Sequence, residues 1–283
     1  MMRIARFALH LAVLLAAIIG SAPPASADLA GGIIGRSDSR STGIVDHGAW
    51  SGLLKTYVKT APDGINRVDY AAFKAGGHGK LKGYLKQMIR VDPRLLSRNE
   101  QFAFLVNLYN AKTIDIVLEH YPVSSIKDIS LGGGLLAAFA GGPWKKKVVA
   151  INSIAVSLDD IEHEILRKTF RDPRVHYALN CASLGCPNIA RQAFSGATLD
   201  AQLDAAARSF INHPRGVHVA AGRVVVSSIY EWFKADFGGS SGHVLRHLLK
   251  YAKPELAAKL KSKSSISGND YDWRLNDVRG RAP

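Results

Sequence analysis

The sequence is most informative about its architecture in the segment Arg98-Asn-Glu-Gln-Phe-Ala-Phe-Leu-Val-Asn-Leu-Tyr-Asn-Ala111. Apolar residues fall on most sides of a helix wound through this segment, which predicts a largely buried helix over about residues 98–120. Ser97 precedes the helix and Glu100 follows three residues later, which is the spacing of a capping box. Pro122 ends the helix.

Two asparagines interrupt this apolar helix. Asn107 and Asn110 are three residues apart and therefore share one helix face. Because asparagine is a poor helix former, two asparagines in this helix indicate that their buried side chains form hydrogen bonds. A structural hydrogen-bond network that fixes helix packing is the favoured interpretation. The alternative is that Asn107, Asn110 and Glu100 are supporting polar groups of an active site.

Helical spacing of apolar residues predicts further helices on both sides of this one. They cover residues 49–60, 80–89, 158–170, 198–212, 229–237, 243–252 and 254–261. Short β-rich runs predict two hairpins, 147–151 with 154–156 and 217–220 with 223–227, and residues 174–179 are expected to form another strand. Helices and hairpins without regular βαβ units predict an α+β fold, a helix-rich single domain with a small, mainly antiparallel sheet.

The N-terminus has the pattern of a cleavable signal peptide over residues 1–27. Arg3 and Arg6 precede an apolar run over residues 7–20, and Ala25-Ser26-Ala27 is a small-x-small cleavage site. The apolar run is shorter than the roughly 20 residues that a spanning helix needs, so an uncleaved anchor is the less favoured alternative. We therefore expect a periplasmic or secreted protein with no transmembrane segment after cleavage.

Composition divides the remaining chain into a leader and a domain, and the distribution of charge indicates which partners to expect. Residues 28–47, rich in glycine and serine at their start, are expected to be a flexible leader before a domain over residues 48–283. The chain has 37 Lys and Arg against 23 Asp and Glu, a net charge of +14. The basic residues are spread over the chain and no nucleic-acid-binding motif is present. The expected partner is therefore an unknown substrate or partner in the cell envelope, not a nucleic acid.

Chemistry is most strongly indicated in Arg174-Val-His-Tyr-Ala-Leu-Asn-Cys-Ala-Ser-Leu-Gly-Cys-Pro187, which holds the two cysteines of the chain. In one hypothesis Cys181 is a nucleophile and His176 its base, because an imidazolium stabilises the reactive thiolate. Asn180 would then stabilise an oxyanion. In a second hypothesis Cys181 and Cys186 form a disulfide, as exported proteins often do.

Other groups could complete or replace this arrangement. Zinc bound by His176 and both cysteines is a third alternative, but the spacing matches no standard zinc motif, so no metal or other cofactor is expected. His218, in the run 217–220, is a reserve candidate for the base, because a histidine that follows the cysteine in the chain is the order found in papain-like hydrolases. Glu231 and Asp236 could orient an imidazole.

Several motifs, in the same order along the chain, resemble the domain of unknown function 547 (DUF547) family. They are Glu100-Gln101 with Phe104-Leu-Val-Asn-Leu-Tyr-Asn-Ala111, Tyr121-Pro-Val with Ser125-Ile126, Pro143-Trp144, Leu158-Asp-Asp-Ile-Glu-His163, the segment 174–187, Tyr230-Glu-Trp-Phe233 with Asp236-Phe237, and Tyr271-Asp272-Trp273. The resemblance runs from about Trp50 to Asn276. Family members often have Trp-Ile-Asn where this chain has Leu105-Val106-Asn107, which changes packing rather than chemistry.

The resemblance implies an exported bacterial family member and no particular reaction. The Asn-Cys segment with a nearby His is similar to the sites of papain-like and transglutaminase-like enzymes, and this analogy adds the expectation of a fold of that kind. The leading hypothesis is thus an exported thiol-dependent hydrolase or acyl transferase. The alternative is a non-enzymatic envelope binding domain with a Cys181–Cys186 disulfide.

Overall fold

A computed structural model of the chain describes residues 28–35, 40–131 and 142–280. The signal peptide expected over residues 1–27 lies outside these residues. Within them, none of the helices combines the length and the apolar character needed to cross a membrane.

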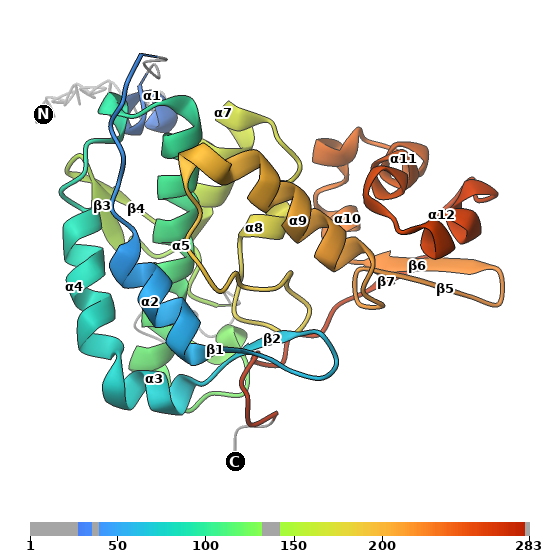
Figure 1. Ribbon diagram of the computed structural model, residues 1–283, viewed down its shortest axis with the longest axis horizontal. Helices are drawn as coiled ribbons and strands as arrows, with labels where there is room; N and C mark the ends of the chain where they lie inside the picture. The colour runs from blue at the N-terminus through green and yellow to red at the C-terminus, as the bar shows by residue number, and fades with distance from the viewer. Residues whose placement is uncertain (1–27, 36–39, 132–141, 281–283) are drawn as a thin grey trace, which may run out of the picture.

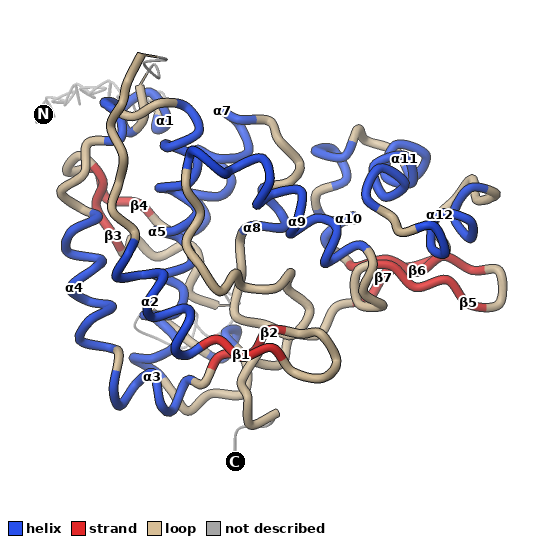
Figure 2. Tube along the Cα trace, in the orientation of Figure 1, coloured by secondary structure: helices blue, strands red, loops and turns tan. Residues whose placement is uncertain are grey.

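Helices form most of the regular structure (Figures 1 and 2). The α-helices are α1 (Leu29–Ile33), α2 (Gly48–Tyr57), α3 (Tyr70–Gly76), α4 (His78–Met88), α5 (Arg98–His120), α7 (Lys168–Phe170), α8 (Val175–Ala178), α9 (Leu199–Ile211), α10 (Ile229–Trp232), α11 (Ser241–Tyr251) and α12 (Pro254–Lys261). A π-helical segment, η3 (Asp160–Arg167), leads into α7. Short 3-10 turns are η1 (Pro93–Leu95), η2 (Ile126–Asp128), η4 (Gly196–Thr198) and η5 (Lys234–Phe237).

Strands pair in three separate small sheets (Figure 2). The antiparallel pairs are β1 (Val58–Thr60) with β2 (Asn66–Val68) and β3 (Val149–Ile151) with β4 (Ile154–Val156). In the third sheet, β5 (Val217–Ala220) pairs antiparallel with β6 (Arg223–Ser227), and β7 (Gly268–Asp270) is parallel to β6. The helix-rich α+β prediction and both hairpins are confirmed, although the strands form three sheets and not one.

Helix α5 runs through the larger hydrophobic core, as its sequence predicts. It is buried from Glu100 to Ala111 and again over residues 113–118. Helices α3 and α4, η3 and the turn η4 pack directly against it. In Figure 1 this part of the molecule lies on the left, with α4 and α2 in front of and beside α5. A single long apolar helix therefore organises the first half of the fold.

A second, smaller core lies under α9, α11, α12 and the β5–β6 hairpin, on the right of Figure 1. Phe210, Tyr230 and Leu248 are fully or almost fully buried there. Tyr177 of α8 belongs to this core, whereas Ala178 and Leu179 belong to the core around α5. The segment that carries His176 and the cysteines therefore lies where the two cores meet.

The strand expected over residues 174–179 is wrong, because residues 175–178 form the helical turn α8. The turn starts after Pro173, where the Asp172 carboxylate accepts a hydrogen bond from the backbone N–H of Arg174 at 2.8 Å. The backbone N–H of Val175 then donates to the carbonyl of Asp172. A short apolar run is compatible with either a buried strand or a buried helical turn, so periodicity could not separate them.

The capping box expected at Ser97 is also wrong. The Ser97 side chain makes no capping hydrogen bond. The buried Glu100 carboxylate instead accepts hydrogen bonds from the backbone N–H groups of Val45 at 2.9 Å and Gly196 at 2.7 Å. These partners are distant in sequence, so local spacing could not reveal them.

Within the segment 28–47, expected as a flexible leader, residues 28–35 carry helix α1 and pack against the protein. Ile33 and Ile34 are buried in the larger core. The buried Gln101 side chain donates a hydrogen bond to the carbonyl of Ile34 at 2.9 Å. Residues 29–35 and Val45 are thus attached to the first turn of α5.

Candidate functional site

A pocket that is open to solvent lies beside the cysteine segment. Its walls come from α5, the start of η3, α8, the turn after α8, α10 and the C-terminal segment 271–273. The lining residues are Tyr109, Trp144, Asp159, Glu162, His163, His176, Leu179, Cys181, Cys186, Pro187, Ile229, Trp232, Phe233, Tyr271 and Trp273. His176 and both cysteines of the sequence hypothesis therefore share one pocket.

Asn110 of α5 fixes the start of the cysteine turn. Its amide nitrogen donates to the carbonyl of Ala178 at 2.9 Å, and its amide oxygen accepts from the backbone N–H of Asn180 at 2.9 Å. Asn107 pairs in the same two-bond manner with the backbone of Phe194. Both asparagines thus satisfy buried backbone groups in turns that α5 supports.

Asn180 is placed inside the turn. Its Nδ2 donates to the carbonyl of Pro187 at 2.8 Å, and its Oδ1 accepts from the backbone N–H of Ala182 at 2.9 Å. These bonds close the turn around Ala182, whose φ of 61° is unusual for a residue with a side chain. Because the amide already donates to Pro187, the structure gives Asn180 a positioning role.

Cys181 and Cys186 form a disulfide in the pocket wall, as one of the sequence hypotheses predicted. Cys186 is buried, and Cys181 is partly exposed to the pocket. The Tyr271 hydroxyl lies 3.1 Å from each sulfur and 3.0 Å from Ser183 Oγ. Burial raises the pKa of Tyr271, so its hydroxyl remains a neutral hydrogen-bond donor. In the disulfide neither sulfur is the thiolate that zinc requires.

The C-terminal segment holds this turn from its other side. The backbone N–H groups of Leu184 and Gly185 donate to the carbonyls of Arg274 and Asp272, each at 2.8 Å. A side chain at Gly185 would collide with the backbone of Asp272. The close approach explains the glycine and brings Tyr271 to the sulfurs.

His176 is oriented by a carboxylate. Its Nε2 lies 2.7 Å from Asp236 Oδ2, and Asp236 is also bound by Arg167 Nε at 2.6 Å. Burial alone would raise the pKa of Asp236, but the hydrogen bonds from His176 and Arg167 hold it well below its ordinary value. An ionised Asp236 accepts the proton on Nε2, so the Nδ1 atom of a neutral His176 is the proton acceptor.

The structure decides between the other residues that the sequence suggested as the base or as the carboxylate that orients it. His218 is exposed on β5 and does not line the pocket. Glu231 is exposed and pairs with Lys234 at 2.7 Å. Of the two carboxylates considered, only Asp236 binds His176.

Two further carboxylates, which the sequence indicates only as part of a family motif, line the pocket. Asp159 and Glu162 approach His163 at 3.8 and 3.9 Å, and the Tyr109 hydroxyl donates to Glu162 Oε2 at 3.1 Å. Burial raises the pKa of Asp159. The signal was present in the motif Leu158-Asp-Asp-Ile-Glu-His163. The motif leads into a π-helical segment, Asp160–Arg167, and segments of this kind are often found at functional sites.

Aromatic rings form much of the remaining wall. The ring centroids of Trp232 and Tyr271 are 4.8 Å apart, and those of Tyr271 and Trp273 are 4.7 Å apart. Trp144 meets Trp273 edge-on at 5.9 Å. Trp232 is 48% exposed, which is unusual for a tryptophan in a folded protein and marks an accessible ring.

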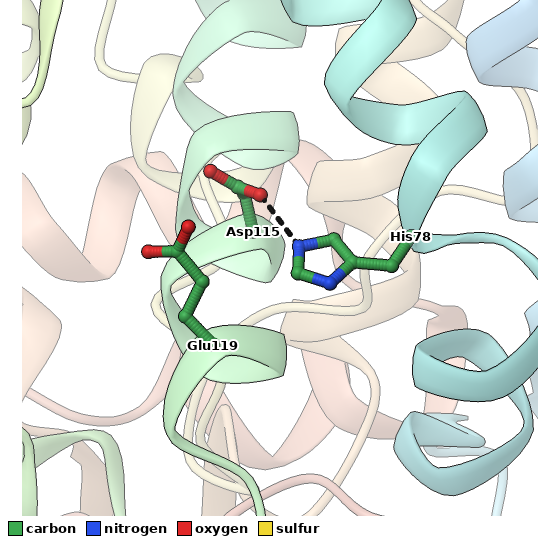
Figure 3. Close-up of side chains that lie close together, drawn as sticks. All are labelled: His78, Asp115 and Glu119. Carbon is green, nitrogen blue, oxygen red and sulfur yellow. Dashed lines mark hydrogen bonds and ion pairs between the residues drawn. The ribbon is translucent and has the colours of Figure 1, made fainter.

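A second group of possible metal ligands lies between α4 and α5. His78, Asp115 and Glu119 there bring three ligand atoms within 4.8 Å of one another (Figure 3). His78 Nε2 binds Asp115 Oδ1 at 2.8 Å, and Lys112 Nζ binds Asp115 Oδ2 at 2.7 Å. Lys82 pairs with Glu119 at 3.0 Å. Because lysines already balance both carboxylates, we interpret this group as an ion-pair network that links α4 to α5.

Comparison with known proteins gives a family. Residues 93–211 match the family described as "Protein of unknown function, DUF547", as the motifs predicted. The matched region includes Asn110, His176 and both cysteines. No curated protein and no solved structure matches the chain significantly.

Proposed function

From the match of residues 93–211 to the DUF547 family of proteins of unknown function, we propose that the protein is a thiol-dependent hydrolase or acyl transferase that acts outside the cytoplasm in its reduced form. One observation carries the proposal. Cys181 lines the same pocket as His176, whose imidazole is held by Asp236 at 2.7 Å. Nucleophile, base and orienting carboxylate are the three roles that thiol hydrolases combine.

The disulfide must open before Cys181 can act. A dithiol donor would reduce it, giving two thiols on Cys181 and Cys186 and leaving the donor as a disulfide. Cys181 is the nucleophile because it is the more exposed of the two cysteines. The Tyr271 hydroxyl, 3.1 Å from its sulfur, can then donate a hydrogen bond to the thiolate.

The acyl transfer follows from the orientation of His176. Nδ1 takes the proton of the Cys181 thiol, and the thiolate attacks the acyl carbon of the substrate. The imidazolium returns the proton to the leaving group as the bond to it breaks and a thioester remains. Water or a second nucleophile then gives its proton to His176, attacks the thioester and releases the Cys181 thiolate, which His176 reprotonates.

The test uses variants that separate thiol reactivity from reduction. Cys186→Ala leaves Cys181 as a free thiol without a reductant, and Cys181→Ala does the same for Cys186. We expect iodoacetamide at pH 7 to label Cys181 at least about tenfold faster than Cys186, because Cys181 is partly exposed in the pocket that the oriented imidazole lines, whereas Cys186 is buried. Adding His176→Gln to Cys186→Ala should remove this advantage, and the matched control His218→Gln should preserve it. Equal, slow labelling of the two cysteines would rule the nucleophile out.

Acylation gives the direct readout. With a p-nitrophenyl ester, the Cys186→Ala variant should release a burst of p-nitrophenol and gain one acyl group on Cys181, as measured by intact mass. The pair Cys186→Ala with His176→Gln should give no burst.

A non-enzymatic binding domain is the second candidate, and the Cys181–Cys186 disulfide is the observation that favours it. The bond would then be a permanent support of the pocket wall. Alkylation of the native chain would take place only after strong reduction, and the two single-cysteine variants would show neither burst nor adduct.

A further inference from the structure

The pocket is acidic in a basic protein. The chain carries a net charge of +14, yet the pocket is lined by Asp159 and Glu162 and by no lysine or arginine among the described residues. The side chains of Asp159 and Glu162 are 29% and 13% exposed, so the carboxylates are largely removed from water. Carboxylates in such a place are more stable beside a cation than alone.

Positive charge from the protein acts on Asp159 from His163 and from the exposed Lys145, and Lys145 does not line the pocket. In the described part of the chain, their ion pairs are with His163 alone, at 3.8 and 3.9 Å. These distances are long for ion pairs, and the histidine is charged only when protonated. A ligand could therefore provide the cation.

Aromatic rings face the same space. Trp144, Trp232, Tyr271 and Trp273 line the pocket together with the carboxylates. The face of an indole or phenol ring attracts a cation within about 6 Å of its centroid. The combination of several aromatic rings with carboxylates is the arrangement that proteins use to hold substituted ammonium groups.

Two aromatic rings of the pocket wall, Trp273 and Phe233, already accept cations from the chain itself. Lys127 Nζ lies 5.0 Å from the centroid of Trp273, and the Arg167 guanidinium carbon lies 4.6 Å from that of Phe233. Neither Lys127 nor Arg167 lines the pocket. Rings of this wall are thus placed where cations approach them.

We propose that this pocket binds the substituted ammonium group of an organic cation, with the positive charge against Asp159 and Glu162 and the alkyl groups against Trp144, Trp232 and Trp273. As a statement about substrates it rests on the proposed function, because the acyl group would then be carried by a cationic molecule. As a statement about binding it stands without the cysteines.

The test compares probes of one shape and different charge. Choline and 3,3-dimethylbutan-1-ol differ mainly in the replacement of nitrogen by carbon, and methyl β-glucoside is a neutral ligand that also stacks on tryptophan. Binding is measured by titration calorimetry with the disulfide-intact chain and with a Cys181→Ser, Cys186→Ser variant. We expect choline to bind at least about fivefold more tightly than either neutral probe in both proteins. Equal binding of the three probes, preference for a neutral probe, or no binding of choline would overturn the proposal.

Charge-neutral variants locate the site. Glu162→Gln keeps an acceptor oxygen for Tyr109 and should weaken choline binding about fivefold, while binding of the alcohol stays the same. Glu164→Gln is the matched control, because Glu164 lies two residues further on in η3, pairs with Lys168 and does not line the pocket. Trp232→Leu should weaken choline binding and Trp232→Phe should restore part of it. If Glu164→Gln weakens choline binding as much as Glu162→Gln, the ion is bound elsewhere.

The outcomes separate this proposal from the proposed function. Choline binding without labelling or acylation of Cys181 supports the ligand class and refutes the thiol enzyme. A reactive Cys181 in a chain without preference for the cation supports the enzyme and refutes the ligand class.

Discussion

At the scale of single residues, the chemistry of the site depends on side chains whose partners are far away in sequence. Asp236 is 60 residues from His176 and Tyr271 is 90 residues from Cys181. The sequence predicted two alternatives for the cysteine segment, a reactive Cys181–His176 pair and a Cys181–Cys186 disulfide. It could name Asp236 only as one of two carboxylates, because no spacing rule links groups brought together by tertiary packing.

Asp236→Asn tests whether the carboxylate acts as an anion. The low pKa of Asp236 means that its charge stabilises the folded chain above its ordinary pKa of 3.8, and this contribution is lost as the pH falls through the lower folded value. We expect the variant to lose about 1 kcal/mol at pH 7, since the carboxylate is partly exposed and screened by water. Urea unfolding at pH 7 and pH 3 measures the effect, and the loss should shrink at pH 3.

Glu231→Gln is the matched control for this change. Glu231 is itself exposed and pairs with the half-buried Lys234, so its removal should alter stability by less than about 0.5 kcal/mol at either pH. A loss for Asp236→Asn that is the same at pH 3 as at pH 7 would show that its charge is not responsible.

At the scale of elements, α5 and the turns beside it determine the geometry of the pocket. The apolar pattern predicted the helix and its burial with good boundaries, because 18 of its 23 residues are buried and leave a strong signal. Helix α8 was mistaken for a strand since four residues carry no measurable period. The sequence correctly predicts that Asn107 and Asn110 form buried hydrogen bonds. Only the structure shows that their partners are backbone groups of the turns beside α5.

Asn110→Ala tests this support. The substitution removes both partners of Ala178 and Asn180 and leaves a buried backbone N–H and a buried carbonyl unsatisfied, which should cost about 2–3 kcal/mol in the free energy of unfolding. Denaturant unfolding measures the loss. Cys181 in an Asn110→Ala, Cys186→Ala chain should also react more slowly with iodoacetamide than in Cys186→Ala alone.

Thr113→Val is a control on the same helix. Thr113 is buried, and within the described part of the chain its hydroxyl has no hydrogen-bond partner. Replacing that hydroxyl by a methyl group of similar shape should leave stability unchanged or slightly raised. A large loss from Thr113→Val would mean that α5 tolerates no substitution, and the loss from Asn110→Ala could not then be assigned to its hydrogen bonds.

At the scale of the whole molecule, two hydrophobic cores meet at the pocket, and a neutral histidine packs against each, His47 buried and His247 half-buried. Burial lowers the pKa of His47 and that of His247 to about 4. His47 lies 2.7 Å from the Tyr84 hydroxyl and His247 2.8 Å from that of Tyr177. The α+β class was predictable from the whole sequence, but the division into two cores was not, since it depends on which apolar faces meet.

These histidines should make the chain sensitive to mild acid. In the unfolded chain both would take up protons near pH 6.5, whereas the folded chain resists protonation until about pH 4. The folded state is therefore favoured above pH 6.5 and loses stability as the pH falls toward 4. Thermal unfolding between pH 7 and pH 4.5 should show a falling midpoint with uptake of about two protons.

Substitution of one histidine identifies the origin of this sensitivity. His247→Gln should remove about half of the pH dependence between pH 6.5 and 4.5, because one of the two titrating groups is gone. His218→Gln, at an exposed position on β5, should leave the pH dependence unchanged. An unchanged slope in His247→Gln would contradict the assignment to these two neutral histidines.

The attachment of residues 29–35 and Val45 to α5 has a practical consequence for anyone who produces the protein. A truncated gene product that starts at residue 48 would remove Ile33 and Ile34 from the core and Val45 from the Glu100 carboxylate. It would expose apolar surface and leave half of a buried carboxylate without its donor, a combination that favours aggregation during expression. Cloning boundaries should therefore be placed at Asp28, where the described helix α1 is preserved in full.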